Sequence, residues 1–503
     1  MVDLNILAEQ CDEKIQNGNE EDIRSLLETV KVFTSEEHSD EKRSCAYYLL
    51  GNLHGKLASL LQENASGWRK NISSGNISPE GDITCKEDDF PINLSAEINY
   101  LRQAKSLVSG QAELIKNEIT TNLANALAHQ RRNIEILNSY KCDFELEGDA
   151  PFVSSLSKAR ELLWISKFLN GESHQNLYDY EAFLLLKRLK GNIHNTDYQS
   201  IVDTINNDPK ILHLLEYGEE FFNPLADWQT KHKSEKYEPK EKAYRKWCLQ
   251  ERLFINPIND ITTEWIADQD ILQFPNHTVK IGDGPYFAAS FSALKREFCF
   301  ARYMAYEGIH QIHPKFETDK LYLVNTLDYV DYSGSTEKIK SAFRICFSVL
   351  DSLATIMNKY FGCNSKKPYF TPCWIEKNFK DYPENYFIDA LYWLSCDLFD
   401  NEKNGAPNPQ EIEIRKMRNA IEHGWLRVAE RECSIWDKDS DFAYLVTPQE
   451  LQNRTLDLLR LVRAAMLYLT FAIKLNENSK KSSDGIVVQS PISVMKDEFI
   501  PHL

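Results

Sequence analysis

The chain has 503 residues, 42% of them hydrophobic and 26% charged, a composition typical of a soluble globular protein with two to four domains. The formal net charge of −17 argues against a protein that coats nucleic acid over its whole surface. No run of about 18 apolar residues occurs, so the sequence predicts neither a transmembrane helix nor a membrane partner. The eleven cysteines include no C-x-x-C pair, and no basic-then-apolar segment opens the chain, so reduced thiols and a cytoplasmic protein are expected.

The negative charge is unevenly distributed along the chain. Residues 336–480 carry 20 basic and 20 acidic residues, so the acidic excess lies almost entirely before them. In the C-terminal third, basic patches are therefore least offset by an excess of acidic residues. We expect any site for a polyanion to lie there.

The first part of the chain predicts helices, because apolar residues recur three and four positions apart. A weak internal repeat is formed by Leu50-Gly51-Asn52 and Leu123-Ala124-Asn125, which are 73 residues apart, about twice the length of a helix-pair repeat. Their surroundings resemble the tetratricopeptide pattern, in which a small residue lets two antiparallel helices approach closely. We therefore expect a tetratricopeptide-like helical region over residues 1–227. An irregular helical bundle is the alternative.

Residues 228–289 predict a linker followed by a packed connector. The segment 228–242 is charged and lacks periodicity, as linkers often do. The segment from Tyr244 to Ile261 is instead dense in aromatic and apolar residues. We interpret it as packing against its neighbours and not as a site.

Residues 290–480 predict a helical bundle, followed by a tail over 481–503. Apolar spacings of three and four predict helices over 290–312, 337–361, 386–399 and 409–429. A last helix begins after Thr447, where Pro448 and Glu450 complete a capping-box pattern. Its apolar residues follow a heptad, which predicts close packing against long partner helices. The predicted fold class is therefore all-α, with a helical-repeat region before a four-helix bundle, whose helices are those over 337–361, 386–399 and 409–429 and the one after Thr447.

The helix predicted over 409–429 contains Arg418-Asn419-Ala420-Ile421-Glu422-His423. An Arg, a polar residue, three spacers and a His on the third helix of such a bundle resemble the HEPN domain, whose signature is R-x4-6-H. A helical-repeat region joined to this domain resembles one bacterial subfamily. The resemblance implies a metal-independent endoribonuclease with Arg418, Asn419 and His423 as its catalytic residues and no cofactor.

These three residue types suit RNA cleavage. The planar fork of Arg418 matches phosphate oxygens, and His423 can accept and then donate a proton near neutral pH. Asn419 lies one turn before His423 and can fix its imidazole or hold a phosphate oxygen. RNA supplies its own nucleophile, the 2′-hydroxyl. No His, Cys or carboxylate cluster flanks the motif in sequence, so no metal is expected.

The spacing of the motif has a geometric consequence. Five residues correspond to about 500° of helical rotation, which leaves Arg418 and His423 about 140° apart. The HEPN resemblance implies that two chains face each other, so we expect a homodimer through the bundle. The alternative, without a catalytic role, is that Arg418 and Glu422 form an ordinary i, i+4 ion pair and that His423 is a surface residue.

Basic residues around the motif predict an RNA-binding surface: Arg415, Lys416, Arg427 and Arg431. A solvated charged helix face is the alternative. Family context implies phage defence by abortive infection, or a toxin, with a protein trigger or regulator acting on the helical region. The competing hypothesis is a non-catalytic HEPN module that binds nucleotides, RNA or a protein.

Overall fold

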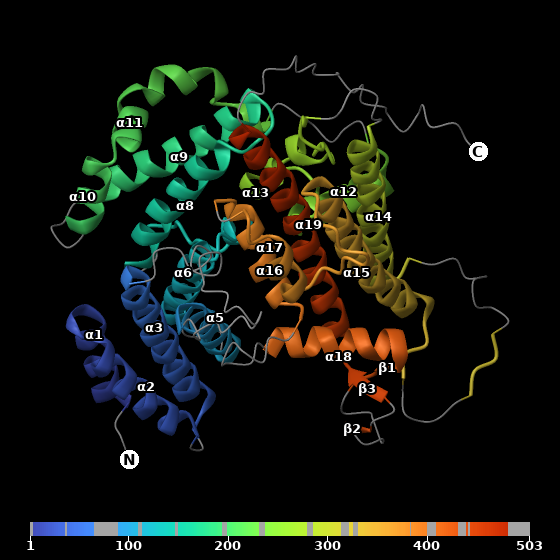
Figure 1. The fold of residues 1–503 in the computed structure, drawn as a ribbon, viewed down its shortest axis with the longest axis horizontal. Helices are drawn as coiled ribbons and strands as arrows, with labels where there is room; N and C mark the ends of the chain where they lie inside the picture. The colour runs from blue at the N-terminus through green and yellow to red at the C-terminus, as the bar shows by residue number, and fades with distance from the viewer. Residues whose placement is uncertain are drawn as a thin grey trace, which may run out of the picture.

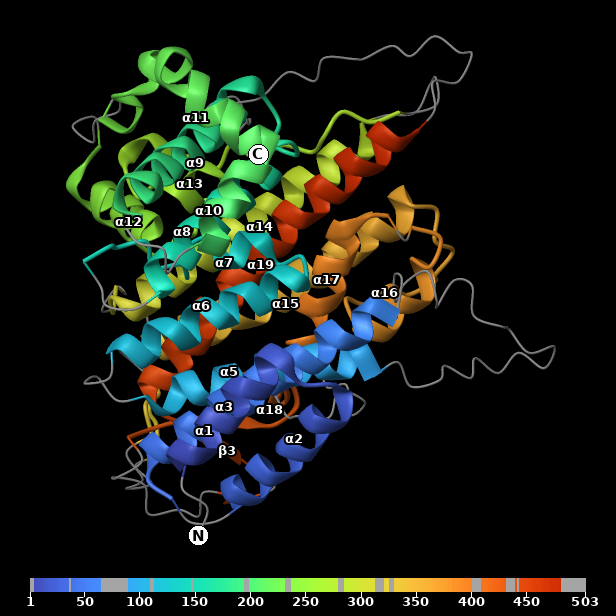
Figure 2. The ribbon, with the colours of Figure 1, turned by 90° about the vertical axis from the view of Figure 1, so that its left-hand side faces the viewer.

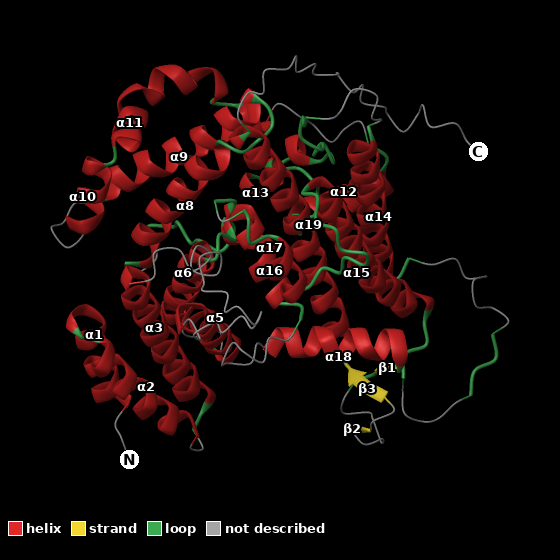
Figure 3. Ribbon diagram, in the orientation of Figure 1, coloured by secondary structure: helices red, strands yellow, loops and turns green. Residues whose placement is uncertain are grey.

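The computed structural model describes most of the chain. The described residues are 4–35, 38–64, 89–108, 113–145, 149–193, 199–230, 237–278, 285–312, 321–324, 330–382, 384–399, 409–430, 439–440 and 443–480. The predicted tail over 481–503 therefore lies outside them. The all-α prediction is confirmed, because helices make up nearly all of the regular structure in these ranges (Figure 3).

Helices form most of the described part of the N-terminal region, as expected. They are α1 (Leu4–Asn17), α2 (Glu20–Ser35), α3 (Asp40–Asn64), α5 (Asp89–Leu107), α6 (Glu113–His129), α7 (Asn133–Ile136), α8 (Ala150–Ser166), α9 (Glu172–Asn192), α10 (Gln199–Asn207) and α11 (Pro209–Phe222) (Figure 1). Gly51 of α3 faces α5 so closely that an added Cβ would lie 2.8 Å from Leu101 Cγ. The small residue therefore lets these two helices approach, as predicted. Their tetratricopeptide-like character stays a prediction.

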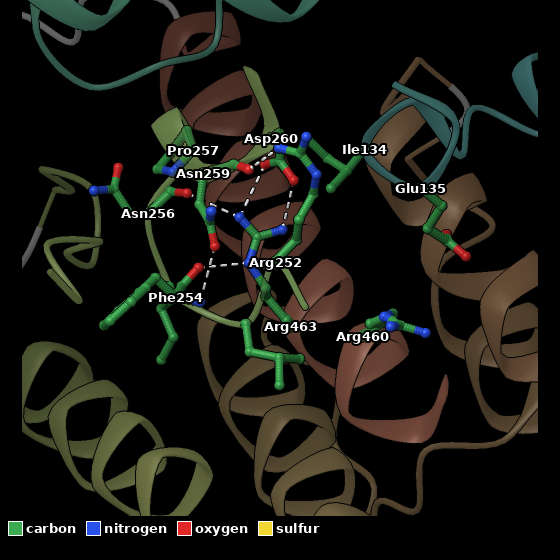
Figure 4. A network of polar contacts seen from close by, with 12 residues as sticks. Ile134, Glu135, Arg252, Phe254, Asn256, Pro257, Asn259, Asp260, Arg460 and Arg463 are labelled. Atoms are coloured by element: carbon green, nitrogen blue, oxygen red, sulfur yellow. Dashed lines mark hydrogen bonds and ion pairs between the residues drawn. The ribbon is translucent and has the colours of Figure 1, made fainter. Parts of the chain in front are cut away.

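The short helix η2 (Asn223–Leu225) lies at the end of the N-terminal region. The segment 228–289 that follows is packed and partly helical, with η3 (Trp228–Thr230), α12 (Pro239–Gln250), α13 (Ile258–Ile261) and η5 (Trp265–Ala267). Its polar contacts converge on Arg463, which projects from the last helix of the chain (Figure 4). Arg463 Nη1 donates to Asp260 Oδ1 at 2.7 Å, and Nη2 donates to the Asn256 carbonyl at 2.8 Å. Both charged side chains are almost fully buried. This ion pair docks the connector onto the bundle.

The C-terminal region consists of α14 (Tyr286–Ile309), α15 (Gly334–Tyr360), α16 (Pro372–Asn378), α17 (Tyr386–Cys396), α18 (Pro409–His423) and α19 (Pro448–Ser479). Helices α14, α15 and α19 run along one another, whereas α18 lies across their lower end (Figure 1). The predicted cap of α19 is confirmed, because Glu450 N donates to Thr447 Oγ1 at 3.1 Å and Thr447 N donates to Glu450 Oε2 at 2.7 Å.

Helix α19 is the central element of the molecule. Its predicted heptad positions are all buried: Leu451, Thr455, Leu458, Val462, Ala465, Leu469 and Ala472. Side chains on its other faces, such as Met466 and Tyr468, are buried as well, because helices of the N-terminal region cover them (Figure 2). One hydrophobic core runs from Ile134 to Ile473. It therefore crosses the boundary predicted at residues 227 and 228.

The prediction of one helix over 409–429 was wrong at its C-terminal end. Helix α18 stops at His423, and Trp425–Val428 forms strand β1, which pairs in parallel with β3 (Ala443–Val446). Strand β2 (Asp439–Ser440) pairs antiparallel with β3. Gly424 weakens the helix, and the strand buries Leu426 and Val428 while satisfying its backbone groups. The predicted inward face of α18 is buried in the protein core at Ile414, Met417 and Ile421.

Candidate functional site

Helix α18 presents the three motif residues differently. Asn419 and His423 are exposed, whereas Arg418 is half-buried. Arg418 faces α15, and His423 forms the last residue of the helix just before the turn into β1. The structure therefore places Arg418 against α15 and leaves His423 exposed at the end of the helix.

Arg418 is held between two aromatic rings. Its guanidinium carbon lies 4.5 Å from the ring centre of Phe347 on α15 and 5.4 Å from that of Phe399, distances at which cation–π attraction operates. Asp351 lies one helical turn beyond Phe347. Burial raises the pKa of Asp351, while the Phe370 amide and the Arg418 charge lower it. These neighbours orient the guanidinium.

A second arginine, which sequence reasoning missed, lies at the His423 end of α18. Arg344 of α15 donates from Nη2 to the Ile421 carbonyl at 2.8 Å, and its Nε lies 3.7 Å from Glu422 Oε1. The alternative interpretation of the motif had paired Glu422 with Arg418. Arg344 is 77 residues before Ile421, so nothing local in the sequence marks this contact.

The structure separates the basic residues that were predicted to bind RNA. Lys416 is exposed, with its Nζ 5.8 Å from the ring centre of Tyr444, and Arg415 is half-buried. Arg427 is only 4% exposed and lies 5.5 Å from the Trp425 ring, because it belongs to β1 and not to a continuation of α18. Its side chain is therefore not presented on the surface. Arg431 lies outside the described residues.

Comparison with protein families identifies the domain that contains this site. Residues 278–476 match the family described as LA2681-like HEPN. This segment is a HEPN domain. It includes α14 to α18 and nearly all of α19, and therefore Arg418, Asn419 and His423. No curated protein and no solved structure gave a significant match to the chain.

Across the described ranges, no three His, Cys, Asp or Glu side chains gather as a metal-binding group would. None of the described helices combines the length and apolarity needed to cross a membrane.

Proposed function

We propose that this protein is an endoribonuclease whose HEPN domain cleaves RNA without a metal. The observation that carries the proposal is the exposed His423, which ends α18 of the matched domain with the R-N-x-x-x-H motif complete. An exposed imidazole can reach a bound backbone and can exchange protons with it near neutral pH. The guanidinium groups of Arg418 and Arg344 supply positive charge where α18 contacts α15.

In the proposed reaction, the 2′-oxygen of one nucleotide attacks the adjacent phosphorus and its proton passes to a base. The bond from phosphorus to the 5′-oxygen breaks, and that oxygen takes a proton from an acid. His423 performs proton transfer in this scheme, and Arg418 neutralises the charge that develops on the phosphate oxygens. Asn419, one turn before His423, orients the imidazole or a phosphate oxygen. The products carry 2′,3′-cyclic phosphate and 5′-hydroxyl ends.

We further propose that two chains share the cleft, since a spacing of five residues places Arg418 and His423 about 140° apart around one helix. The heptad face of α19 is covered by the chain itself, so it is not available to a second chain. The proposed two-fold contact therefore lies elsewhere on the HEPN domain, with the α18 helices facing. Mixing Arg418→Ala and His423→Ala chains should restore part of the activity, because one cleft then keeps an intact Arg and His. A monomer with full activity would contradict the shared cleft.

The N-terminal helical region is proposed to regulate the nuclease in response to a protein trigger in phage defence, or to restrain a toxin, in the cytoplasm. Two arginines of this region, Arg102 and Arg132, bind Asp397. Asp397 lies two residues before Phe399, which contacts Arg418. This short path supports regulation of Arg418 by the helical region. The described cysteines are free thiols, which suits a reducing compartment.

The test is an RNA cleavage assay with purified protein in EDTA, with the ends of the products analysed. His423→Ala and Arg418→Ala should each lower the rate by about a hundredfold or more, the size expected for loss of a proton-transfer group or a charge stabiliser. His310→Ala is the matched control, because His310 is an exposed histidine at the end of α14. Full activity in His423→Ala, or a requirement for added magnesium, would refute this mechanism. Binding of RNA without cleavage would instead favour the non-catalytic module.

A further inference from the structure

Arg344 combines two properties at the end of α18. It caps the helix by donating to the Ile421 carbonyl at 2.8 Å, two residues before His423. Carbonyl groups in the last turn of a helix have no partner within the helix, and a cation there is favourable. The guanidinium is therefore bound to the last turn of α18, the helix that ends at the proposed catalytic histidine of the same chain.

This arginine keeps donor capacity for a ligand. A guanidinium has five N–H groups, and the Ile421 carbonyl takes only one at good hydrogen-bond distance. Its second contact, to Glu422, is long at 3.7 Å, and both side chains are 42% exposed. Ion pairs of this kind contribute little to stability. An anion arriving from solvent can therefore replace the Glu422 carboxylate at small cost.

We propose that Arg344 binds an RNA phosphate next to His423, and that Glu422 occupies this position when RNA is absent. The proposal rests on the proposed function, because it takes RNA as the ligand. A phosphodiester carries one negative charge and offers oxygen pairs that match the guanidinium fork, as a carboxylate does. Arg344 then places the substrate within one chain, whereas Arg418 remains held by Phe347 and Phe399.

The experiment measures binding of a labelled single-stranded RNA across a range of salt concentrations, with every variant built on His423→Ala so that the RNA stays intact. Arg344→Ala should weaken binding by roughly tenfold or more, as expected for loss of a charged hydrogen bond. It should also lower the slope of log affinity against log salt by about 0.7, the value for one phosphate contact on a single strand. Arg344→Lys should keep the slope, since its charge remains.

Two further variants separate phosphate binding from a structural role. Arg454 of α19 anchors the other end of α18 through Glu413, with Nε and Oε2 2.6 Å apart, so Arg454→Ala is the matched control and should leave the slope unchanged. Glu422→Gln should tighten binding, because it removes the competing carboxylate. A purely structural Arg344 predicts equal losses in Arg344→Ala and Arg454→Ala and no gain in Glu422→Gln.

An unchanged slope in Arg344→Ala, or weaker binding in Glu422→Gln, would overturn the proposal. If Arg344→Ala does not fold, the Glu422→Gln result decides alone. Cleavage by the unmodified protein is scored separately. A lower slope together with no cleavage by the unmodified protein would refute the nuclease and retain the phosphate site.

Discussion

Replacing Asp397 with Asn should destabilise the protein strongly, because this carboxylate joins two distant parts of the chain. Asp397 follows α17, and each of its oxygens accepts from Arg102 of α5 at 2.7 Å. Arg132 Nη1 donates to the same carboxylate at 2.5 Å and is itself only 1% exposed. Glu135 provides the other partner of Arg132. Asn cannot neutralise two buried guanidinium groups.

The structure gives the magnitude. Burial alone would raise the pKa of Asp397, but Arg102 and Arg132 outweigh burial and hold the pKa at about 2, against an ordinary value of 3.8. A pKa lowered this far corresponds to about 2 kcal/mol of stability at neutral pH. This contribution is complete above pH ~3.8, the unfolded-state value, and is lost as the pH falls through about 2. Removing the charge also takes the carboxylate away from Arg102 and leaves buried Arg132 with Glu135 alone, so the expected total is about 3–5 kcal/mol.

Urea denaturation at pH 7, followed by circular dichroism, measures the loss. The matched control is Asp457→Asn, because Asp457 is paired with Arg454 and Arg460 but its side chain is 36% exposed. It should cost less than about 1 kcal/mol. The difference between wild type and Asp397→Asn should shrink below pH 3.8. A loss under about 1 kcal/mol at pH 7, equal to that of the control, would refute the reasoning.

Two further predictions concern packing. Arg463→Met should lower the free energy of unfolding, measured with heat or urea, by about 3–5 kcal/mol, because Asp260 is left charged and buried. A double variant that also carries Asp260→Leu should recover much of this loss. If it does not, the ion pair is not the cause. Gly51→Ala should destabilise by about 1–3 kcal/mol, because the new Cβ would meet Leu101, whereas Gly191→Ala in α9, which has open space, should be neutral or stabilising. Equal effects at the two glycines would contradict the close approach of α3 and α5.

Sequence patterns predicted the long helices because each pattern is local. The Thr447 cap and the heptad of α19 depend on residues three and four apart, and the structure confirms both. The strand after α18 could not be predicted in the same way. Trp425 and Val428 continue the helical spacing of Ile421, and β1 becomes preferable only through pairing with Ala443–Val446 further along the chain.

The motif was found in sequence, whereas most of its surroundings were not. Arg418 and His423 occupy one helix, so their spacing could be read and their divergence calculated. Phe347 and Arg344 approach from α15, about 70 to 80 residues earlier. Their spacing of three, with Asp351 four residues further, places all three on one face of α15. The sequence shows that this face of α15 carries polar and aromatic residues, but it does not show that α18 packs against it.

Charge counts predicted where a polyanion would bind, but they cannot tell internal charge from surface charge. Of the basic residues in the C-terminal third, Arg427 and Arg463 are buried, and Arg463 neutralises Asp260 inside the protein. Arg454 is paired with Glu413 and Asp457. These side chains add to the balance of charges without adding to the field outside the molecule. The positive charge at the surface near α18 therefore comes from a smaller set of side chains, and the exposure of each one matters more than the number in the sequence.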